Sequence, residues 1–271
     1  MRATNVLVVS SIALFAIFFF DAFANLNEQV DIGGRAALGA FEFIGAAGSL
    51  YLLSAGRPGN ASALDWLACA SAILVACTGF AGASTTLLAF YFFIRDRDDL
   101  NTRAAGIVAG AVAVQAVWAP LIFSKFAFVF LQVDASVVGW LVSHFVPAAS
   151  WDGTVVYTPS GHNVEITAAC ASFHNLSLAS LCWVTLTMLH RPYWLQSDLY
   201  VGLAALLVQF SFNILRLVFV CLSLPMYEFW HDGFGKHIFS AVATASAIIF
   251  VQISLIRRDQ RNHSPRSAAL S

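Results

Sequence analysis

The chain has 271 residues, of which 59% are hydrophobic, only 11% are charged and 24 are phenylalanines. Soluble domains contain roughly 45–50% apolar residues, so this composition indicates an integral membrane protein. The formal net charge is −1 and the few cations are scattered between apolar runs, which excludes a nucleic-acid-binding protein because phosphate binding needs a basic face.

Runs of about 18 or more apolar residues predict membrane-spanning helices, because the hydrocarbon core needs roughly 20 residues of helix. In chain order such runs lie at 6–25, 36–54, 105–131, 169–189, 199–223 and 237–256. The first run lacks a small-x-small cleavage site before polar sequence, so we expect a retained anchor rather than a signal peptide.

The apolar run at 64–94 is too long for one ordinary span and carries Gly79 and Gly82 in its middle. We therefore expect a hairpin of two short helices. Lys and Arg in short loops favour the cytoplasm. With Arg2 inside, the hairpin returns the three arginines that follow it to the inside, whereas a single span would place them outside. The predicted fold is an all-α polytopic membrane protein with about eight transmembrane helices and both termini cytoplasmic.

This topology places two segments on the outer face, 133–168 and 224–236. Within the first, 135–146 is typical of a short interfacial helix. Apolar and polar residues then alternate over 154–158 and 163–167 on either side of a Pro-Ser-Gly turn, which is typical of a β-hairpin. We expect a small extracytoplasmic hairpin directly before the next span.

The domain organisation is simple. Residues 1–256 are expected to form a single transmembrane domain, followed by a short basic cytoplasmic tail at 257–271. The basic residues of this tail are typical of the flank of a last span.

Cys170 differs from the other four cysteines, which lie inside apolar runs where cysteine usually packs as a small hydrophobe. No close CxxC pair is present. Cys170 instead lies at the outer start of a span, after a polar and extended stretch, where the amino terminus of a helix favours a thiolate. His174, one turn along the same helix, is a rival base for this thiol, or a polar residue that is hydrogen-bonded between helices.

Arg216 lies within the apolar stretch NILRLVFVCL. A charge within a span costs about 2.5–3.5 kcal/mol on insertion scales, so such a residue usually faces a cavity or a partner. The alternative is an arginine that reaches to the outer interface. Asn213, three residues earlier on the same helix face, is expected to hold the guanidinium or a substrate carbonyl, or to be satisfied by a neighbouring helix.

His231 and His237 follow on the outer side, in WHDGFGKHIFS. Histidine titrates near neutral pH and can pass a proton to a leaving amine, so each is a candidate general acid and base. Asp232, next to His231, is a candidate helix cap.

The ordered motifs VEITAACAS, NILR and HDGFG resemble those of the exosortase/archaeosortase family of polytopic membrane cysteine transpeptidases, over roughly residues 105–256. The resemblance implies that Cys170 is the nucleophile and that Arg216 and His231 complete the site. His237 is the alternative histidine, because its separation from the arginine is closer to that of the best-known members. The family's usual Ser-Gly after the cysteine is replaced here by Ala171 and Ser172.

The resemblance also implies an activity and a location. Family members cut a carboxy-terminal sorting signal, such as Pro-Glu-Pro followed by a span and a basic tail, from exported proteins through a cysteine thioester. The implied partners are a membrane protein substrate and the lipid bilayer, and no cofactor or metal is expected. Many such enzymes accompany exopolysaccharide biosynthesis, in a bacterial inner membrane with the active site on the periplasmic face.

Two other classes of protein compete with this hypothesis. In a non-enzymatic carrier or scaffold for polysaccharide export, Arg216 would bind an anionic lipid-linked sugar and Cys170 would only pack. In a haem or quinone protein, two histidines would face one another at mid-membrane depth, whereas most histidines here lie near the ends of the apolar runs.

Overall fold

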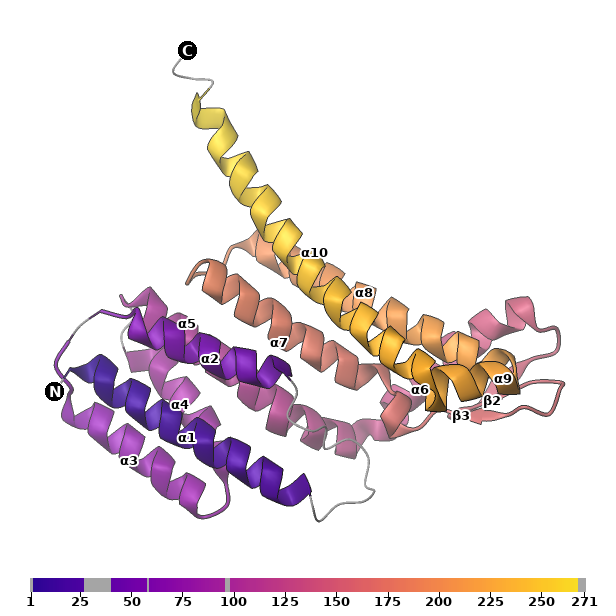
Figure 1. Ribbon diagram of the computed structural model, residues 1–271, viewed down its shortest axis with the longest axis horizontal. Coiled ribbons are helices and arrows are strands. Elements are labelled where there is room, and N and C mark those ends of the chain that lie inside the picture. The colour runs from indigo at the N-terminus through magenta and orange to yellow at the C-terminus, as the bar shows by residue number, and fades with distance from the viewer. Residues whose placement is uncertain (1, 27–39, 58, 96–97, 268–271) are drawn as a thin grey trace. The chain divides into compact units, whose positions relative to one another are not determined.

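The computed structural model describes residues 2–26, 40–57, 59–95 and 98–267, and most of them are helical (Figure 1). The first residues of the expected span at 36–54 lie outside this described part. The helices in chain order are α1 (Ala3–Leu26), α2 (Ala40–Ser54), α3 (Ala63–Cys77), α4 (Ala81–Arg95), α5 (Leu100–Ala113), η1 (Val114–Trp118), α6 (Ala119–Phe145), η2 (Ala168–Cys170), α7 (Ser172–His190), α8 (Gln196–Leu222), α9 (Leu224–Tyr227), η3 (Glu228–Asp232) and α10 (Phe234–Ser267). Of these, η1 and η3 are π-helical and η2 is a 3₁₀ turn.

Several described helices are apolar enough to lie in a bilayer. Those that are also long enough to cross it cover Leu100–Phe145, Gln196–Leu222 and Ala241–Arg258. Shorter apolar helices cover Ala3–Phe19, Phe41–Ser54 and Ala63–Cys77. The chain is therefore a mainly helical, multi-pass membrane protein. The number of eight spans stays a prediction, because a helix of 15 residues is only about 22 Å long and the hydrocarbon core is about 30 Å thick.

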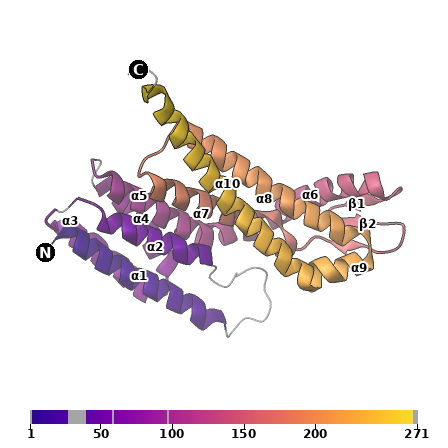
Figure 2. The same cartoon turned by 45° about the horizontal axis from the view of Figure 1, so that its top comes forward.

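The described chain divides into two compact units. The first unit comprises Met1–Pro120 and Ser180–Tyr200, and the second comprises Leu121–Ala179 and Val201–Ser271. In the first unit, helices α1 to α5 pack together, with α5 against both α2 and α4 (Figure 2). Their apolar side chains form a core that includes Leu7, Leu53, Phe92 and Val108.

The expected break in the apolar run at 64–94 is confirmed. Helix α3 ends at Cys77 and α4 begins at Ala81, and the two helices pack against each other. The turn between them contains Gly79 with φ +87°, a left-handed conformation that glycine adopts without the steric cost of a Cβ atom. The backbone conformation of this turn therefore favours the glycine from which the sequence predicted the hairpin.

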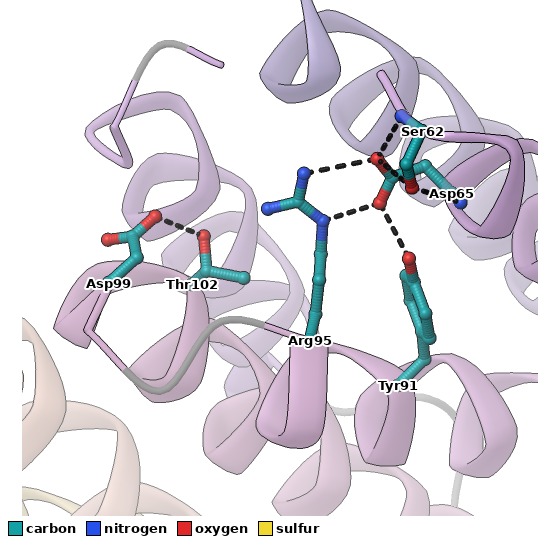
Figure 3. A network of polar contacts seen from close by, with 6 residues as sticks. All are labelled: Ser62, Asp65, Tyr91, Arg95, Asp99 and Thr102. Carbon is teal, nitrogen blue, oxygen red and sulfur yellow. Dashed lines mark hydrogen bonds and ion pairs between the residues drawn. The ribbon is translucent and has the colours of Figure 1, made fainter. Parts of the chain in front are cut away.

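A buried polar network joins the amino-terminal end of α3 to the carboxy-terminal end of α4 (Figure 3). The carboxylate of Asp65 is fully buried and pairs with the guanidinium of Arg95. It also accepts hydrogen bonds from the Tyr91 hydroxyl at 2.6 Å and from the Ser62 backbone N–H at 2.8 Å. Ser62 in turn accepts from the Asp65 backbone, so the pair forms a capping box at the start of α3. The network satisfies a charge that would otherwise be costly to bury.

The expectation of a separate interfacial helix at 135–146 is wrong. Helix α6 continues without a break to Phe145, and its irregular points lie earlier, at the π-helical turn η1 before Pro120 and at Phe126, which has φ −119° and ψ 17°. Proline lacks the N–H that an α-helix needs, which accounts for a local change of helix type ahead of Pro120. Within this continuous helix, the carboxylate of Asp134 accepts a hydrogen bond from the Ser172 backbone N–H.

The expected hairpin is present and belongs to a three-stranded antiparallel sheet in the second unit. The strands are β1 (Ser150–Asp152), β2 (Val155–Tyr157) and β3 (Val164–Glu165), in the order β1-β2-β3. The sequence predicted β2 and β3 but not β1. The sheet and α9 lie at the same end of this unit in both views (Figures 1 and 2).

Helices α8 and α10 run side by side in the second unit (Figures 1 and 2). The Gln209 side chain of α8 donates to the backbone oxygen of Ala243 in α10, and the rings of Phe212 and Phe239 meet edge to face. Helix α10 continues past Arg257 to Ser267, so much of the basic tail is helical.

Candidate active site

Cys170 lies between the sheet and helix α7, at the end of the 3₁₀ turn η2. The next residue, Ala171, is extended with φ −61° and ψ 140°, so α7 begins only at Ser172. The Cys170 side chain is buried, with 5% exposure, in an apolar cluster that it shares with Ile214, Leu217 and Cys221 of α8. The sequence placed this cysteine at the start of the span, and the structure places it just before the helix.

The Cys170 sulfur faces a histidine that is 61 residues away in the sequence. Its Sγ atom lies 3.2 Å from Nε2 of His231. The other ring nitrogen of His231, Nδ1, lies 2.7 Å from an Oδ1 atom of Asp232. Both residues belong to η3, so this π-helical turn presents an imidazole to the thiol and a carboxylate to the imidazole. Such turns are frequent at functional sites.

Tyr227 packs flat on the His231 imidazole, with ring centroids 4.7 Å apart and planes 19° from parallel. The Tyr227 ring also meets the ring of His162, in the β2–β3 connection, edge to face at 5.7 Å. Burial, and secondarily the nearby Asp232 carboxylate, raises the pKa of the Tyr227 hydroxyl, so this phenol stays neutral at physiological pH. The stacking limits how far the His231 ring can turn.

The backbone N–H groups next to the thiol are already hydrogen-bonded. The N–H of Cys170 donates to Thr167 O at 2.9 Å, and that of Ala171 donates to Ala168 O at 3.3 Å. The N–H of Ser172, at the start of α7, donates to the carboxylate of Asp134 at 2.7 Å. Asp134 is a buried residue of α6, so it caps α7 from another helix.

Asn213 of α8 fixes the backbone around the cysteine. Its Nδ2 donates to Cys170 O and to Ser172 Oγ, each at 2.9 Å, and its Oδ1 accepts from Asn175 Nδ2 at 3.0 Å. The Asn213 side chain is buried, so these three bonds use most of what an amide can make. Of the roles expected for Asn213 from the sequence, the structure shows one: hydrogen bonds with neighbouring elements satisfy its amide group.

Arg216 lies three residues after Asn213 on α8, about 60° around the helix. Residues before and after it, Ile214 and Leu217, pack in the same apolar cluster as Cys170. The Arg216 side chain is half-buried, and its Nε atom is buried without a hydrogen-bond partner within the described part of the chain. No hydrogen bond between Arg216 and Cys170 occurs among the described residues.

Of the two alternative histidines, the structure describes only the side chain of His174, and His237 stays a prediction. His174 lies on α7 with an exposed side chain and makes no hydrogen bond to Cys170 within the described residues. His237 lies in the first turn of α10, and its side chain is outside the described part of the structure.

Sequence reasoning did not single out Asp134 or Tyr227, and it took Asp232 as a candidate helix cap rather than as a partner of His231. Asp232 had one usable signal, because it directly follows the candidate histidine. Within the described ranges, no group of three or more His, Cys, Asp or Glu side chains is placed to hold a metal ion.

A comparison with family models matches residues 5–248 to the transmembrane exosortase family. The chain belongs to the transmembrane exosortase family. The match spans most of the sequence and begins well before residue 105, so the amino-terminal helices belong to the exosortase region too. Searches of curated proteins and of solved structures found no match. Membership supports a membrane-embedded transpeptidase-type role in general and confirms the resemblance drawn from the motifs.

Proposed function

We propose that this exosortase is a cysteine transpeptidase that cuts the carboxy-terminal sorting signal of exported membrane proteins. The observation that supports it best is the 3.2 Å approach of His231 Nε2 to Cys170 Sγ. A thiol in hydrogen-bond contact with an imidazole is the pairing that generates a nucleophilic thiolate in unrelated cysteine proteases. Family membership supports the reaction class, and the contact between the two side chains supports Cys170 and His231 as the residues that carry it.

The reaction proceeds in two steps. The Cys170 thiol gives its proton to His231 Nε2, and the sulfur attacks the scissile carbonyl carbon to form a C–S bond. The C–N bond then breaks, and the imidazolium returns its proton to the departing amine, which carries away the carboxy-terminal anchor. An amine, a hydroxyl group or water attacks the thioester and releases the product from the sulfur.

Arg216 stabilises the oxyanion of the tetrahedral intermediate. Oxyanion holes are often built from backbone N–H groups, but those of residues 170 to 172 are already occupied. The amide of Asn213 is also used. Arg216 is the remaining donor on this stretch of α8, and its buried Nε lacks a partner among the described residues.

The edge of β3 holds the extended substrate. Ile166 N–H bonds to Thr154 O at 2.9 Å, and hydrogen-bonded pairs alternate along an antiparallel ladder. The N–H and C=O of Glu165 therefore point away from β2, at the free edge of the sheet. Glu165 is exposed and lies five residues before Cys170, so a peptide added to this edge would lead toward the thiol.

The substrate is an exported protein that ends in a short motif such as Pro-Glu-Pro, a membrane span and a basic tail. The active site faces the periplasm of a bacterial inner membrane, and the processed proteins belong to the cell surface or to exopolysaccharide production. These assignments rest on the family and on the distribution of Lys and Arg along the chain.

The test is cleavage of a reporter protein that ends in such a signal, co-expressed with the full chain and followed by size in membrane fractions. Cys170→Ala and His231→Ala are expected to abolish cleavage. Cys182→Ala is the matched control, because Cys182 is a buried cysteine of the adjoining helix α7. Full cleavage by Cys170→Ala would refute the proposal.

The unpaired Nε of Arg216 also favours one alternative, a carrier that binds an anionic lipid-linked sugar. The two functions differ in their dependence on the thiol. A carrier tolerates Cys170→Ala and fails with Arg216→Ala, whereas a transpeptidase fails with both.

A further inference from the structure

The imidazole of His231 has a partner at each of its two nitrogens. Nε2 faces Cys170 Sγ at 3.2 Å, and Nδ1 faces Asp232 Oδ1 at 2.7 Å. An ionised carboxylate only accepts hydrogen bonds, so Nδ1 must carry a proton in this pair. In a neutral imidazole, Nε2 is then the lone-pair nitrogen, and this is the atom that faces the thiol.

The backbone of η3 allows the two adjacent residues His231 and Asp232 to form a hydrogen bond with each other. The π-helical turn ends at Asp232, and the following Gly233 is extended, with φ −94° and ψ −164°. A Cβ atom on Gly233 would lie 2.8 Å from the backbone oxygen of Glu228, so the turn closes this tightly only around glycine. The sharp end of the turn lets the Asp232 carboxylate fold back on the ring of the preceding residue.

We propose that Asp232 is the positioning residue of His231, holding the imidazole in the tautomer that accepts the Cys170 proton and stabilising the imidazolium that results. The inference rests on the proposed function, and it adds a third residue to the pair. Among the described residues Asp232 forms no hydrogen bond with Cys170, so it acts through His231. Tyr227, stacked on the same ring, restricts rotation that would break both hydrogen bonds.

Exposure limits the size of the expected effect. The Asp232 side chain is 66% exposed and that of His231 is 29% exposed. A fully buried aspartate in a serine protease triad accounts for about 10⁴ in kcat when it becomes asparagine, whereas exposed ion pairs are worth only a few-fold. We expect a loss of about tenfold for Asp232, and a smaller loss in high salt because solvent ions screen the carboxylate.

The experiment measures the rate of Cys170 alkylation by iodoacetamide against pH, in the purified full chain in detergent, with each cysteine read by mass spectrometry. In the described part of the chain, the titratable groups that face His231 are Cys170, Asp232 and Tyr227, with His162 behind Tyr227. Asp232→Asn is expected to slow alkylation near pH 7 about tenfold and to move the profile to higher pH. Asp232→Glu is expected to restore most of the rate.

Glu228→Gln is the matched control, because Glu228 is an exposed acid in the same π-helical turn and forms no hydrogen bond with His231 among the described residues. It removes the same charge and is expected to leave the profile unchanged. If Asp232→Asn behaves like Glu228→Gln, the carboxylate does not position the imidazole and the inference is overturned.

A double variant tests whether Asp232 acts through His231. With His231→Ala already present, adding Asp232→Asn should cost nothing further, because the group it positions is gone. Additive losses would overturn the inference. The readout is the rate of Cys170 alkylation rather than cleavage, so the two proposals can fail separately. If Asp232→Asn slows alkylation through His231 but the wild-type chain does not cleave the reporter, the proposed function is refuted and the role of Asp232 stands.

Discussion

Replacing Asn213 by alanine should destabilise the second unit, because one buried amide joins three elements. The substitution deletes two donated bonds, to Cys170 O and Ser172 Oγ, and one accepted from Asn175. Hydrogen bonds between helices in a membrane average about 0.6 kcal/mol each. Bonds that leave buried groups unpaired when removed cost about 1 kcal/mol or more. Three bonds therefore predict a loss of about 2 to 3 kcal/mol, and also a slower Cys170 alkylation because the thiol is no longer held.

The assay is reversible unfolding of the purified protein in mixed detergent micelles, followed by tryptophan fluorescence. Asn101→Ala is the control, because Asn101 is also an asparagine but, among the described residues, its side chain forms one exposed bond, from Nδ2 to Ala55 O at 2.8 Å. It should cost about 0.5 kcal/mol. Equal losses for the two variants, or an unchanged alkylation rate in Asn213→Ala, would refute the idea that this amide fixes the backbone of the cysteine.

Three further substitutions test other parts of the structure. Asp65→Ala leaves the largely buried guanidinium of Arg95 without its carboxylate, and should lower the free energy of unfolding by about 3 kcal/mol in the same assay. Asp134→Ala removes the cap of α7 and should cost about 1 to 2 kcal/mol, whereas Asp134→Asn keeps an acceptor oxygen and should cost less. Gly233→Ala places a methyl group 2.8 Å from the Glu228 oxygen and should slow Cys170 alkylation by displacing the π-helical turn. A wild-type stability for Asp65→Ala or Asp134→Ala would contradict the contact that the substitution removes. A wild-type alkylation rate for Gly233→Ala would contradict the tight closure of the turn.

The sequence predicted those parts of the fold that depend on local composition. The apolar runs, the glycine in the turn between α3 and α4 and the alternating residues of β2 and β3 all act over a few residues, so they can be recognised without tertiary contacts. Strand β1 has only three residues, all exposed, which leaves no alternation to detect. The end of α6 was misplaced because the expected span was ended with the apolar run at 131, whereas the helix continues to Phe145.

The candidate site could be predicted as a set of residues but not as an arrangement. Cys170 and His231 were each unusual in their own surroundings, yet their 3.2 Å approach depends on the packing of η2 and η3 in three dimensions. Asp232 was taken as a helix cap because the sequence gives no sign of a π-helical turn. The hydrogen bond from the Ser172 backbone N–H to Asp134 also depends on the packing of α6 against α7.

The most direct test of the transpeptidase account is detection of the acyl-enzyme. The full chain is incubated with the sorting-signal reporter, quenched in acid and analysed by mass spectrometry with and without hydroxylamine, which cleaves thioesters. The account predicts that the amino-terminal part of the reporter is attached to Cys170, that hydroxylamine releases it as a hydroxamate, and that Cys170→Ala forms no adduct. Cleavage of the reporter without a hydroxylamine-sensitive adduct on Cys170, or with the adduct on another cysteine, would contradict it.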